Sequence, residues 1–330
     1  MMYVILSFQN YNLLMIEPLV SVIMNCYNGE GYLKEALESV LTQSYANFEI
    51  IFWDNVSTDS TRTLVDSYHD KRIKYFLAEK HVSLGEARNL AIQKAQGKYI
   101  AFLDVDDVWL TEKLAEQIQH FNEPEIGLVY CNTNRINSKG KVLDSQGKSA
   151  DHNHSKISFI DLFKNYDITL SSAIVSAQAL NSANGFFDNI LVYAEEYDLF
   201  LRICLNYKAI RIRKILASYR VHEKQETLKF FERGILENEY INSKLLLINE
   251  KAFKENPELL DLKSGQIAWE KFLNDILNGH VGRGRRKIWP YVFKDLKYFA
   301  FYFLSFLGSD FIKSIWDQYL RRKGRLPFLS

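Results

Sequence analysis

Short apolar stretches alternate with longer amphipathic stretches along the first third of the chain, and this order restricts the fold more than any other feature. The apolar stretches are rich in β-branched residues and end in polar ones, as buried strands do, and cover residues 19–28, 48–55, 73–79 and 98–107. The segments between them, residues 30–44, 57–70 and 85–97, have apolar residues at helical spacing. This alternation predicts an α/β domain whose mostly parallel sheet is covered by helices on both faces.

The predicted strands end in polar residues, where ligands of open α/β sheets bind. These are Asn25 and Tyr27 after the first strand, Asp54 after the second, and residues 104–107 after the fourth. The turn after the first strand reads NCYNGEG, which fits neither the dinucleotide-binding nor the P-loop glycine pattern. We therefore expect a polar ligand that is held mainly by side chains.

The sequence DVDD at residues 104–107 places three carboxylates at the end of one strand. Carboxylates this close raise each other's pKa unless a cation or hydrogen bonds offset the repulsion. Magnesium and manganese favour carboxylate and phosphate oxygens, so the cluster suits a metal bridging to a diphosphate. The alternative is that Asp106 or Asp107 caps a helix that begins near Trp109.

The segments around these residues resemble the nucleotide-sugar-binding half of family 2 glycosyltransferases, which are inverting enzymes with the GT-A fold. The resemblance covers Pro18 to Leu114 without an evident gap and includes, in family order, MNCYNGEG, FWDNVSTDST, GEARNLA and AFLDVDD. It continues through the acceptor-side segment around AEEYDLFLR to SYRVHE, which ends at Glu223. The resemblance implies a GT-A (Rossmann-like) domain that uses a nucleotide-sugar donor, with UDP as the expected nucleotide.

The resemblance implies donor-binding roles for four residues when it is carried over position by position. Asn25 and Tyr27 correspond to residues that contact the nucleoside, and Asp54 to a carboxylate that accepts a hydrogen bond from the uracil or its neighbourhood. Arg88 corresponds to a basic residue near the nucleotide. Outside this motif, a lone arginine on a helix would be interpreted as a solvated charge.

The resemblance also separates the three acids of DVDD. It assigns Asp104 to the ribose side of the nucleotide and Asp106 to the metal, which is expected to be Mg²⁺ or Mn²⁺, and it leaves Asp107 in a supporting or capping role.

The base that inverting transfer requires corresponds to the second acid of the pair Glu195-Glu196. The family commonly has an aspartate there, so Glu196 brings one extra methylene to the site. The alternative is that both glutamates are ordinary first-turn acids, which the helix dipole favours.

Arg220 and His222 alternate onto one side of the predicted closing strand, at positions that the family often directs at the diphosphate. The alternative is an edge strand with a solvated arginine and a structural histidine.

The C-terminal third has a helical pattern in which basic clusters flank aromatic residues, most clearly over residues 282–325. We expect an N-terminal extension (1–17), a GT-A domain (18–225) and a helical region (226–330). The helical region suits peripheral contact with a membrane surface, or packing against the catalytic domain or another subunit.

Composition limits the function classes further. The 41 basic and 40 acidic residues nearly balance, so we expect no nucleic acid partner. The three cysteines are widely separated, which argues against a zinc site or disulfides and favours a cytoplasmic location.

We therefore predict an inverting glycosyltransferase that acts on a hydroxyl of a glycan or glycolipid acceptor in cell-surface polysaccharide synthesis. The alternatives are a catalytically inactive nucleotide- or glycan-binding module on the same fold and a nucleotidyltransferase. The second of these normally has a basic glycine-rich loop after the first strand, where this chain has none.

Overall fold

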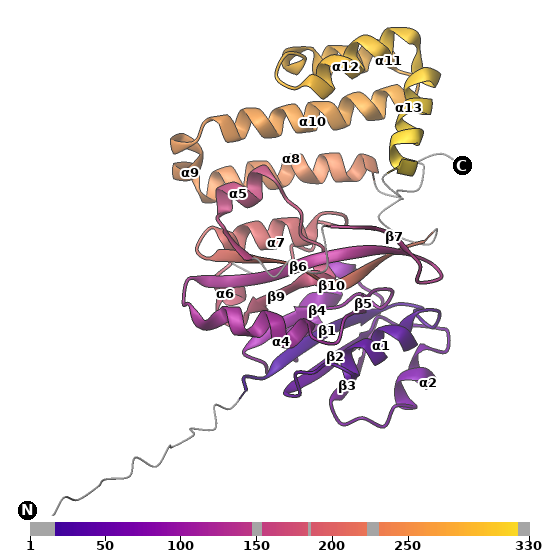
Figure 1. Ribbon diagram of the computed structural model, residues 1–330, viewed down its shortest axis with the longest axis vertical. Coiled ribbons are helices and arrows are strands. Elements are labelled where there is room, and N and C mark those ends of the chain that lie inside the picture. The colour runs from indigo at the N-terminus through magenta and orange to yellow at the C-terminus, as the bar shows by residue number, and fades with distance from the viewer. Residues whose placement is uncertain (1–16, 147–153, 184–185, 223–230, 323–330) are drawn as a thin grey trace, which may run out of the picture.

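A ten-stranded mixed sheet forms the centre of the computed structural model, which describes residues 17–146, 154–183, 186–222 and 231–322 (Figure 1). Eight strands lie in the order β3-β2-β1-β4-β9-β6-β10-β5, and β7 and β8 extend the edges of β6 and β10. The strands are β1 Val20–Cys26, β2 Phe48–Asp54, β3 Ile73–Leu77, β4 Tyr99–Phe102, β5 Val108–Trp109, β6 Ile126–Asn137, β7 Val142–Ser145, β8 His154–Ile157, β9 Ala173–Ser176 and β10 Lys208–Val221.

The longest strand pairings are parallel, which confirms the predicted α/β class. β1 pairs in parallel with β2 and β4, so that Val20 lies opposite both Phe48 and Tyr99. β9 then pairs antiparallel with β4 and with β6, and β6 pairs in parallel with β10. Because β1, β2 and β4 run in the same direction, the residues that follow them meet at one edge of the sheet.

Apolar residues of the sheet bury against helices on both faces. α1, α2 and α4 pack on one face and α3, α5, α6 and α7 on the other, so that the sheet separates two hydrophobic cores. The apolar positions of α1 recur at helical spacing, and Leu33, Leu37 and Val40 are buried on the sheet. These helices are α1 Leu33–Leu41, α2 Thr61–Asp66, α3 Leu84–Ile92, α4 Lys113–Ile118, α5 Phe159–Lys164, α6 Ala177–Ser182 and α7 Glu195–Cys204.

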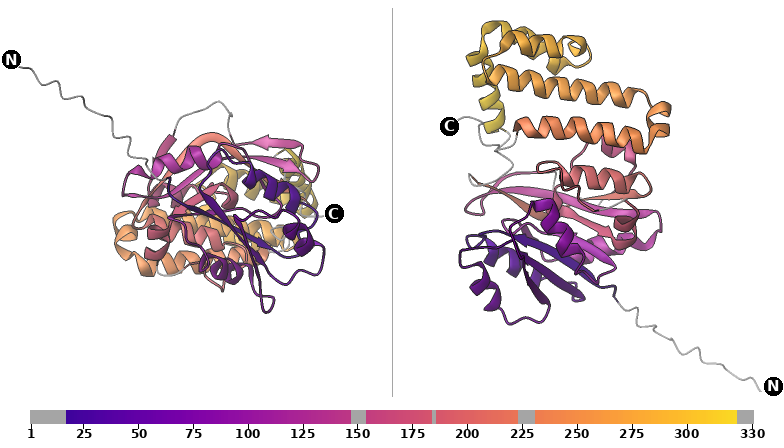
Figure 2. Two further views of the ribbon diagram at one scale, coloured as in Figure 1. Left: turned by 90° about the horizontal axis from the view of Figure 1, so that it is seen from below. Right: turned by 180° about the vertical axis from the view of Figure 1, so that it is seen from behind.

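The C-terminal helices extend the core on the α7 side of the sheet, away from α1 and α2 (Figures 1 and 2). Ile241 and Leu245 of α8, Phe253 of α9 and Leu259 of α10 belong to the same hydrophobic cluster as the α7 side of the sheet. A third cluster joins α10 to the last helices. The C-terminal helices are α8 Phe231–Ile248, α9 Glu250–Glu255, α10 Glu258–Leu277, α11 Val281–Ile288, α12 Leu296–Leu304 and α13 Ser309–Arg322.

Two local expectations are wrong. No helix begins near Trp109: Val108 and Trp109 form β5, which pairs with β10, and the next helix begins at Lys113. The polar composition of residues 141–158 predicts an exposed loop, but the two ends of this segment contain β7 and β8, which pair with the free edges of β6 and β10. Residues 1–16 and the boundary predicted at 225/226 lie outside the described part of the chain. Within that part, no helix is long and apolar enough to cross a bilayer.

Candidate active site

The loops after β1 and β2 hold each other in place at the carboxyl edge of the sheet. The backbone N–H of Asn28 donates to Ser57 Oγ at 2.9 Å, and the Thr58 N–H donates to Asn28 Oδ1 at 2.8 Å. Asn28 has a φ of 54°, which an asparagine tolerates in a turn. Gly29 is required beside it, because a Cβ would lie 2.5 Å from Cys26 Sγ and 3.1 Å from Val105 Cγ2. The first-strand loop is therefore fitted closely against DVDD.

Of the three predicted nucleoside contacts, Tyr27 is the most open. It is 53% exposed, and its ring meets His81 edge-on with centroids 4.4 Å apart, so one face is free to stack on a base. Asn25 is buried, and its Nδ2 has no hydrogen-bond partner among the described residues. Asp54 is buried and accepts from the Ser57 N–H at 2.7 Å and the Tyr75 hydroxyl at 2.6 Å. Contact of these three with a nucleotide stays a prediction.

The three acids of DVDD have different environments. Asp107 is buried and accepts the backbone N–H of Arg220 at 2.8 Å, so it joins the acid loop to β10. Burial, and next the charges of Asp106 and Asp104, raise the pKa of Asp107 well above its usual value. Asp104 and Asp106 are only partly buried. The supporting role predicted for Asp107 agrees with this arrangement, whereas its alternative role as a helix cap does not.

Asp106 and His222 form the part of the site that could hold a divalent metal. His222 Nε2 lies 3.0 Å from Asp106 Oδ2, so a carboxylate and an imidazole converge on one point. The described residues contain no group of three or more histidine, cysteine or acidic side chains that could hold a metal. Two protein ligands fit Mg²⁺ or Mn²⁺ nonetheless, since such ions at phosphoryl-transfer sites take their other ligands from water and substrate phosphates.

Arg220 supports the acid loop. It is 1% exposed, and its guanidinium donates to the carbonyl of Asp106 at 2.7 Å and to Glu35 at 2.6 Å. It also stacks over the ring of Tyr32, against which His222, the residue after β10, packs. The expected alternation of Arg220 and His222 onto one side is thus present, but the Arg220 charge is neutralised within the protein. Contact with a diphosphate stays a prediction for both and is easier to reconcile with His222.

Arg88 connects the two halves of the site. Its Nη2 lies 2.9 Å from Asp104 Oδ1 and its Nη1 lies 2.5 Å from Glu195 Oε1. Arg88 of α3 and Glu195 of α7 are buried, and Asp104 is partly buried. Burial alone would lower the pKa of Arg88, but the carboxylates of Asp104 and Glu195 raise it, so the guanidinium stays charged. Arg88 therefore fixes the DVDD loop relative to the glutamate pair.

The two glutamates of the pair are not equivalent. Both line a pocket, but Glu195 is buried and paired with Arg88, whereas Glu196 forms no ion pair with a described residue. Burial, and next the charge of Glu195, raise the pKa of Glu196 to about 8. A carboxylate with a raised pKa in a pocket suits a general base, and this contrast favours Glu196 over Glu195 for that role.

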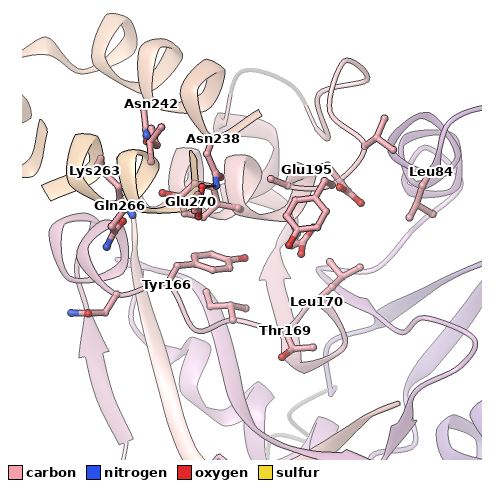
Figure 3. A pocket seen from close by; sticks show the side chains of 18 of the residues that line it. Leu84, Tyr166, Thr169, Leu170, Glu195, Asn238, Asn242, Lys263, Gln266 and Glu270 are labelled. Carbon is pink, nitrogen blue, oxygen red and sulfur yellow. Dashed lines mark hydrogen bonds between the residues drawn. The ribbon is translucent and has the colours of Figure 1, made fainter. Parts of the chain in front are cut away.

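The pocket has a volume of about 660 Å³ and lies between the glutamate pair and the C-terminal helices (Figure 3). Arg88, Asp104 and Glu196 line one end of it. Residues of α8 and α10 line the opposite wall: Asn238, Asn242, Lys263, Gln266, Ile267 and Glu270. The helical region is thus part of the site, which supports the predicted packing on the catalytic domain.

Glu237 of α8 is a functional candidate that sequence reasoning missed. Its carboxylate accepts the backbone N–H groups of Val192, Tyr193 and Ala194 at 2.9, 2.8 and 3.0 Å. These residues directly precede the glutamate pair, so a side chain of the helical region holds the segment that carries Glu196. Its spacing in the sequence is that of any acid on a helix, and no local pattern could have identified it.

Comparison with known proteins places this site in a family. The model of glycosyl transferase family 2 matches residues 21–182. The chain is 35% identical over 212 residues to the Escherichia coli UDP-Glc:alpha-D-GlcNAc-diphosphoundecaprenol beta-1,3-glucosyltransferase WfgD, covering 63% of this chain and 79% of that protein. It is 32% identical over 246 residues to an uncharacterised glycosyltransferase of Methanocaldococcus jannaschii, covering 73% and 83%.

Two solved structures share the fold. The mannosyltransferase PcManGT of Pyrobaculum calidifontis, in complex with GDP-Man and Mn²⁺, superposes with a TM-score of 0.60 over 84% of this chain and 76% of that chain, at 16% identity. S. aureus TarS 1–349, in complex with UDP-GlcNAc, has a TM-score of 0.55 over 82% and 88%, at 18% identity. These similarities show the fold alone, and the sequence relatives show the family. The chain belongs to glycosyl transferase family 2 and has the GT-A fold.

Proposed function

We propose that this glycosyltransferase moves a sugar from a nucleotide diphosphate, with UDP as the expected nucleotide, to a hydroxyl of a glycan or lipid-linked glycan, inverting the anomeric centre. The observation that carries the proposal is the Arg88 bridge between Asp104 and Glu195. This bridge holds the loop with the predicted donor-binding acids close to Glu196. The pocket that Glu196 lines has room for an acceptor.

Glu196 is the proposed base. The acceptor hydroxyl gives its proton to the Glu196 carboxylate while its oxygen bonds to the anomeric carbon, and the bond from that carbon to the diphosphate oxygen breaks. Arg88 pairs with Glu195 beside it and opposes the rise that burial causes in the pKa of Glu195, and the charge of Glu195 contributes to the basicity of Glu196. α8 and α10 cover the pocket and limit the access of water that would compete with the acceptor.

Asp106 and His222 are the residues that would hold Mg²⁺ or Mn²⁺. When bound, the metal would offset the charge of the departing nucleoside diphosphate.

The names of related proteins support the substrate classes. WfgD is described as acting with UDP-Glc on a diphosphoundecaprenol-linked GlcNAc, and a protein of Bacillus subtilis, 38% identical over 130 residues, as a putative teichuronic acid biosynthesis glycosyltransferase. A UDP-sugar donor and an acceptor used in cell-surface polysaccharide synthesis are therefore proposed for this chain.

A nucleotide-sugar hydrolysis screen tests the proposal. Purified protein is offered UDP- and GDP-sugars with Mn²⁺, with Mg²⁺ or with EDTA, and release of the nucleoside diphosphate is measured. We expect slow, metal-dependent hydrolysis of at least one UDP-sugar, and its loss in Asp106→Ala. Binding of UDP without turnover of any donor would instead indicate an inactive binding module. Full activity of Asp106→Ala with the native donor would remove the metal role of Asp106.

We also propose that the outer surface of the C-terminal helices contacts an anionic membrane surface, such as the cytoplasmic face of a cell membrane. Ring contacts link Trp289, Phe293, Phe299 and Phe303 into one patch, in which Phe293 is 76% exposed. From residue 281 to 316 the chain has seven basic and two acidic residues. A second copy of this chain would place its own positive charge against this positively charged face, whereas anionic lipid has the complementary charge.

Vesicle sedimentation tests the membrane contact. The protein should bind vesicles with 30% anionic phospholipid more strongly than neutral vesicles, and the double variant Phe299→Ser/Phe303→Ser should lose most of this binding. Leu77→Ser, at an exposed position on β3, is the matched control and should bind normally. A dimer in solution that the double variant abolishes, without vesicle binding by the wild type, would assign the patch to a second copy.

A further inference from the structure

The wall that α10 contributes to the pocket has the chemistry of a binding site. Lys263, Gln266 and Glu270 are three and four residues apart, so they share one helical face. Figure 3 shows this face across the pocket from Tyr166 and Thr169. None of these residues belongs to the segment that resembles the family, and the chemistry proposed above does not use them.

Lys263 carries an ammonium group that lines the pocket together with Glu270, whose charge acts on it without a direct ion pair. It is 9% exposed, it lines the pocket, and it has no hydrogen bond or ion pair with any residue that the structure describes. The rings of Phe163 and Tyr197 lie 4.8 and 5.5 Å from its Nζ. Burial lowers the pKa of Lys263 to about 8, so it is still mostly charged near neutral pH. A buried, unpaired ammonium costs stability, and a ligand oxygen would compensate for that cost.

The groups around Lys263 indicate which kind of ligand would supply that oxygen. Glu270 accepts a hydrogen bond from Asn238 Nδ2 at 3.3 Å, and Asn242 and Gln266 add amides to the same wall. Tyr166 packs edge-on against Tyr197, with centroids 4.8 Å apart, on the other side. Hydrogen-bond donors and acceptors beside aromatic rings suit a sugar, whose hydroxyls do both. An anionic ligand would meet the carboxylates of Glu270 and Glu196.

We propose that this wall is a second acceptor subsite, which binds an uncharged sugar unit next to the one that carries the attacking hydroxyl. This inference rests on the proposed function, because the same pocket places the attacking hydroxyl at Glu196. Lys263 and Gln266 then determine which glycan is accepted. A volume of about 660 Å³ is within the usual range for ligand pockets, roughly 300–1,000 Å³, and leaves room beyond the reacting sugar.

The test compares monosaccharides with disaccharides. Methyl glycosides of neutral sugars, offered as the monosaccharide, the disaccharide and the matching uronic-acid disaccharide, are titrated in the presence of UDP, and binding is followed by saturation-transfer NMR. The wild type should bind at least one neutral disaccharide about tenfold more tightly than its monosaccharide. Lys263→Met should remove most of this advantage and Gln266→Ala part of it.

Lys271→Met is the matched control, because it removes the same charge from α10 at a residue that pairs with Glu239 outside this pocket. It should keep the disaccharide advantage. Lys263→Met should melt no lower than the wild type, since the change removes a buried unpaired charge, and this separates lost binding from lost folding.

Three outcomes overturn the subsite: no disaccharide advantage in the wild type, an advantage that survives Lys263→Met, or tighter binding of the uronic-acid disaccharide. Hydrolysis of UDP-sugars by the wild type is a separate readout. If the wild type hydrolyses UDP-sugars but binds no disaccharide more tightly than its monosaccharide, the subsite is rejected and the proposed function is not. A Lys263-dependent advantage without turnover of any nucleotide sugar would reject the proposed function and leave a glycan-binding site.

Discussion

The proposed donor end and the proposed acceptor end of this site are built in different ways. At the donor end, residues that follow neighbouring strands hold one another, as when Asn28 and Ser57 join the first two loops. At the acceptor end, α8 and α10 from the C-terminal region supply the wall, and Glu237 holds the segment before α7. Parallel strands must bring the donor loops together, whereas the acceptor wall depends on how added helices pack. A different C-terminal region would therefore change the acceptor end without any change in the sheet.

Glu196→Gln should distinguish the function of the acceptor end from that of the donor end most strongly. The amide has nearly the same shape but cannot take the acceptor proton, so turnover should fall by roughly 10²–10⁴-fold. UDP affinity, measured by calorimetry with Mn²⁺, should stay within about twofold, because Glu196 lies on the acceptor side.

Asp106→Ala is the complementary variant at the donor end. It should weaken manganese-dependent binding of UDP as well as turnover, because the proposed metal position loses its carboxylate. If Glu196→Gln weakened UDP binding as much as Asp106→Ala did, the two ends would not be functionally separate. An unchanged rate in Glu196→Gln would move the base to another residue.

The pH dependence of turnover tests the acceptor end, where Glu196 lies, without a mutation. The pKa of Glu196 is raised to about 8, and the deprotonated form is the active base, so turnover should rise with pH and level off above pH 8. Between pH 6 and pH 8 the increase should be roughly fifty-fold, because the ionised fraction grows about tenfold per pH unit well below the pKa. Initial rates at saturating donor measure it. A flat profile over this range would contradict the assignment.

Glu237→Gln tests whether the helical region positions the base. Loss of the charge weakens three hydrogen bonds to the segment before α7, and a displacement of Glu196 by a fraction of an ångström should lower turnover roughly tenfold. UDP affinity should not change, and the pH midpoint should shift with the environment of Glu196.

Glu239→Gln, two residues away on α8, is the control, because its partner Lys271 lies outside the acceptor pocket. Equal loss of turnover in both variants would mean that α8 affects the site only through overall stability.

The same division explains what could be predicted from the sequence. Arg88, Asp104 and the glutamate pair lie in short motifs that resemble those of the family, and that resemblance assigned them to one site. The helix-cap alternative for Asp107 was wrong because the backbone of Arg220, 113 residues later, reaches that carboxylate. Glu237 and Lys263 have no local signal at all, since an acid or a lysine on a helix usually faces water. Only the packing of α8 and α10 makes them part of the site.

Tyr75→Phe should have the smallest effect on activity. It tests whether the loops of the donor end hold one another in place without help from the rest of the chain. The Tyr75 hydroxyl donates to the buried carboxylate of Asp54 at 2.6 Å, and the second oxygen of Asp54 accepts from the Ser57 N–H. Removing the hydroxyl should lower the free energy of unfolding by about 1–3 kcal/mol, measured by urea denaturation, because one oxygen of a buried carboxylate loses its donor. Turnover should change less than about threefold, since Ser57 still holds the loop. A tenfold loss of UDP affinity with unchanged stability would show instead that Tyr75 orients Asp54 for the nucleotide, and that the donor end relies on more than its own loops.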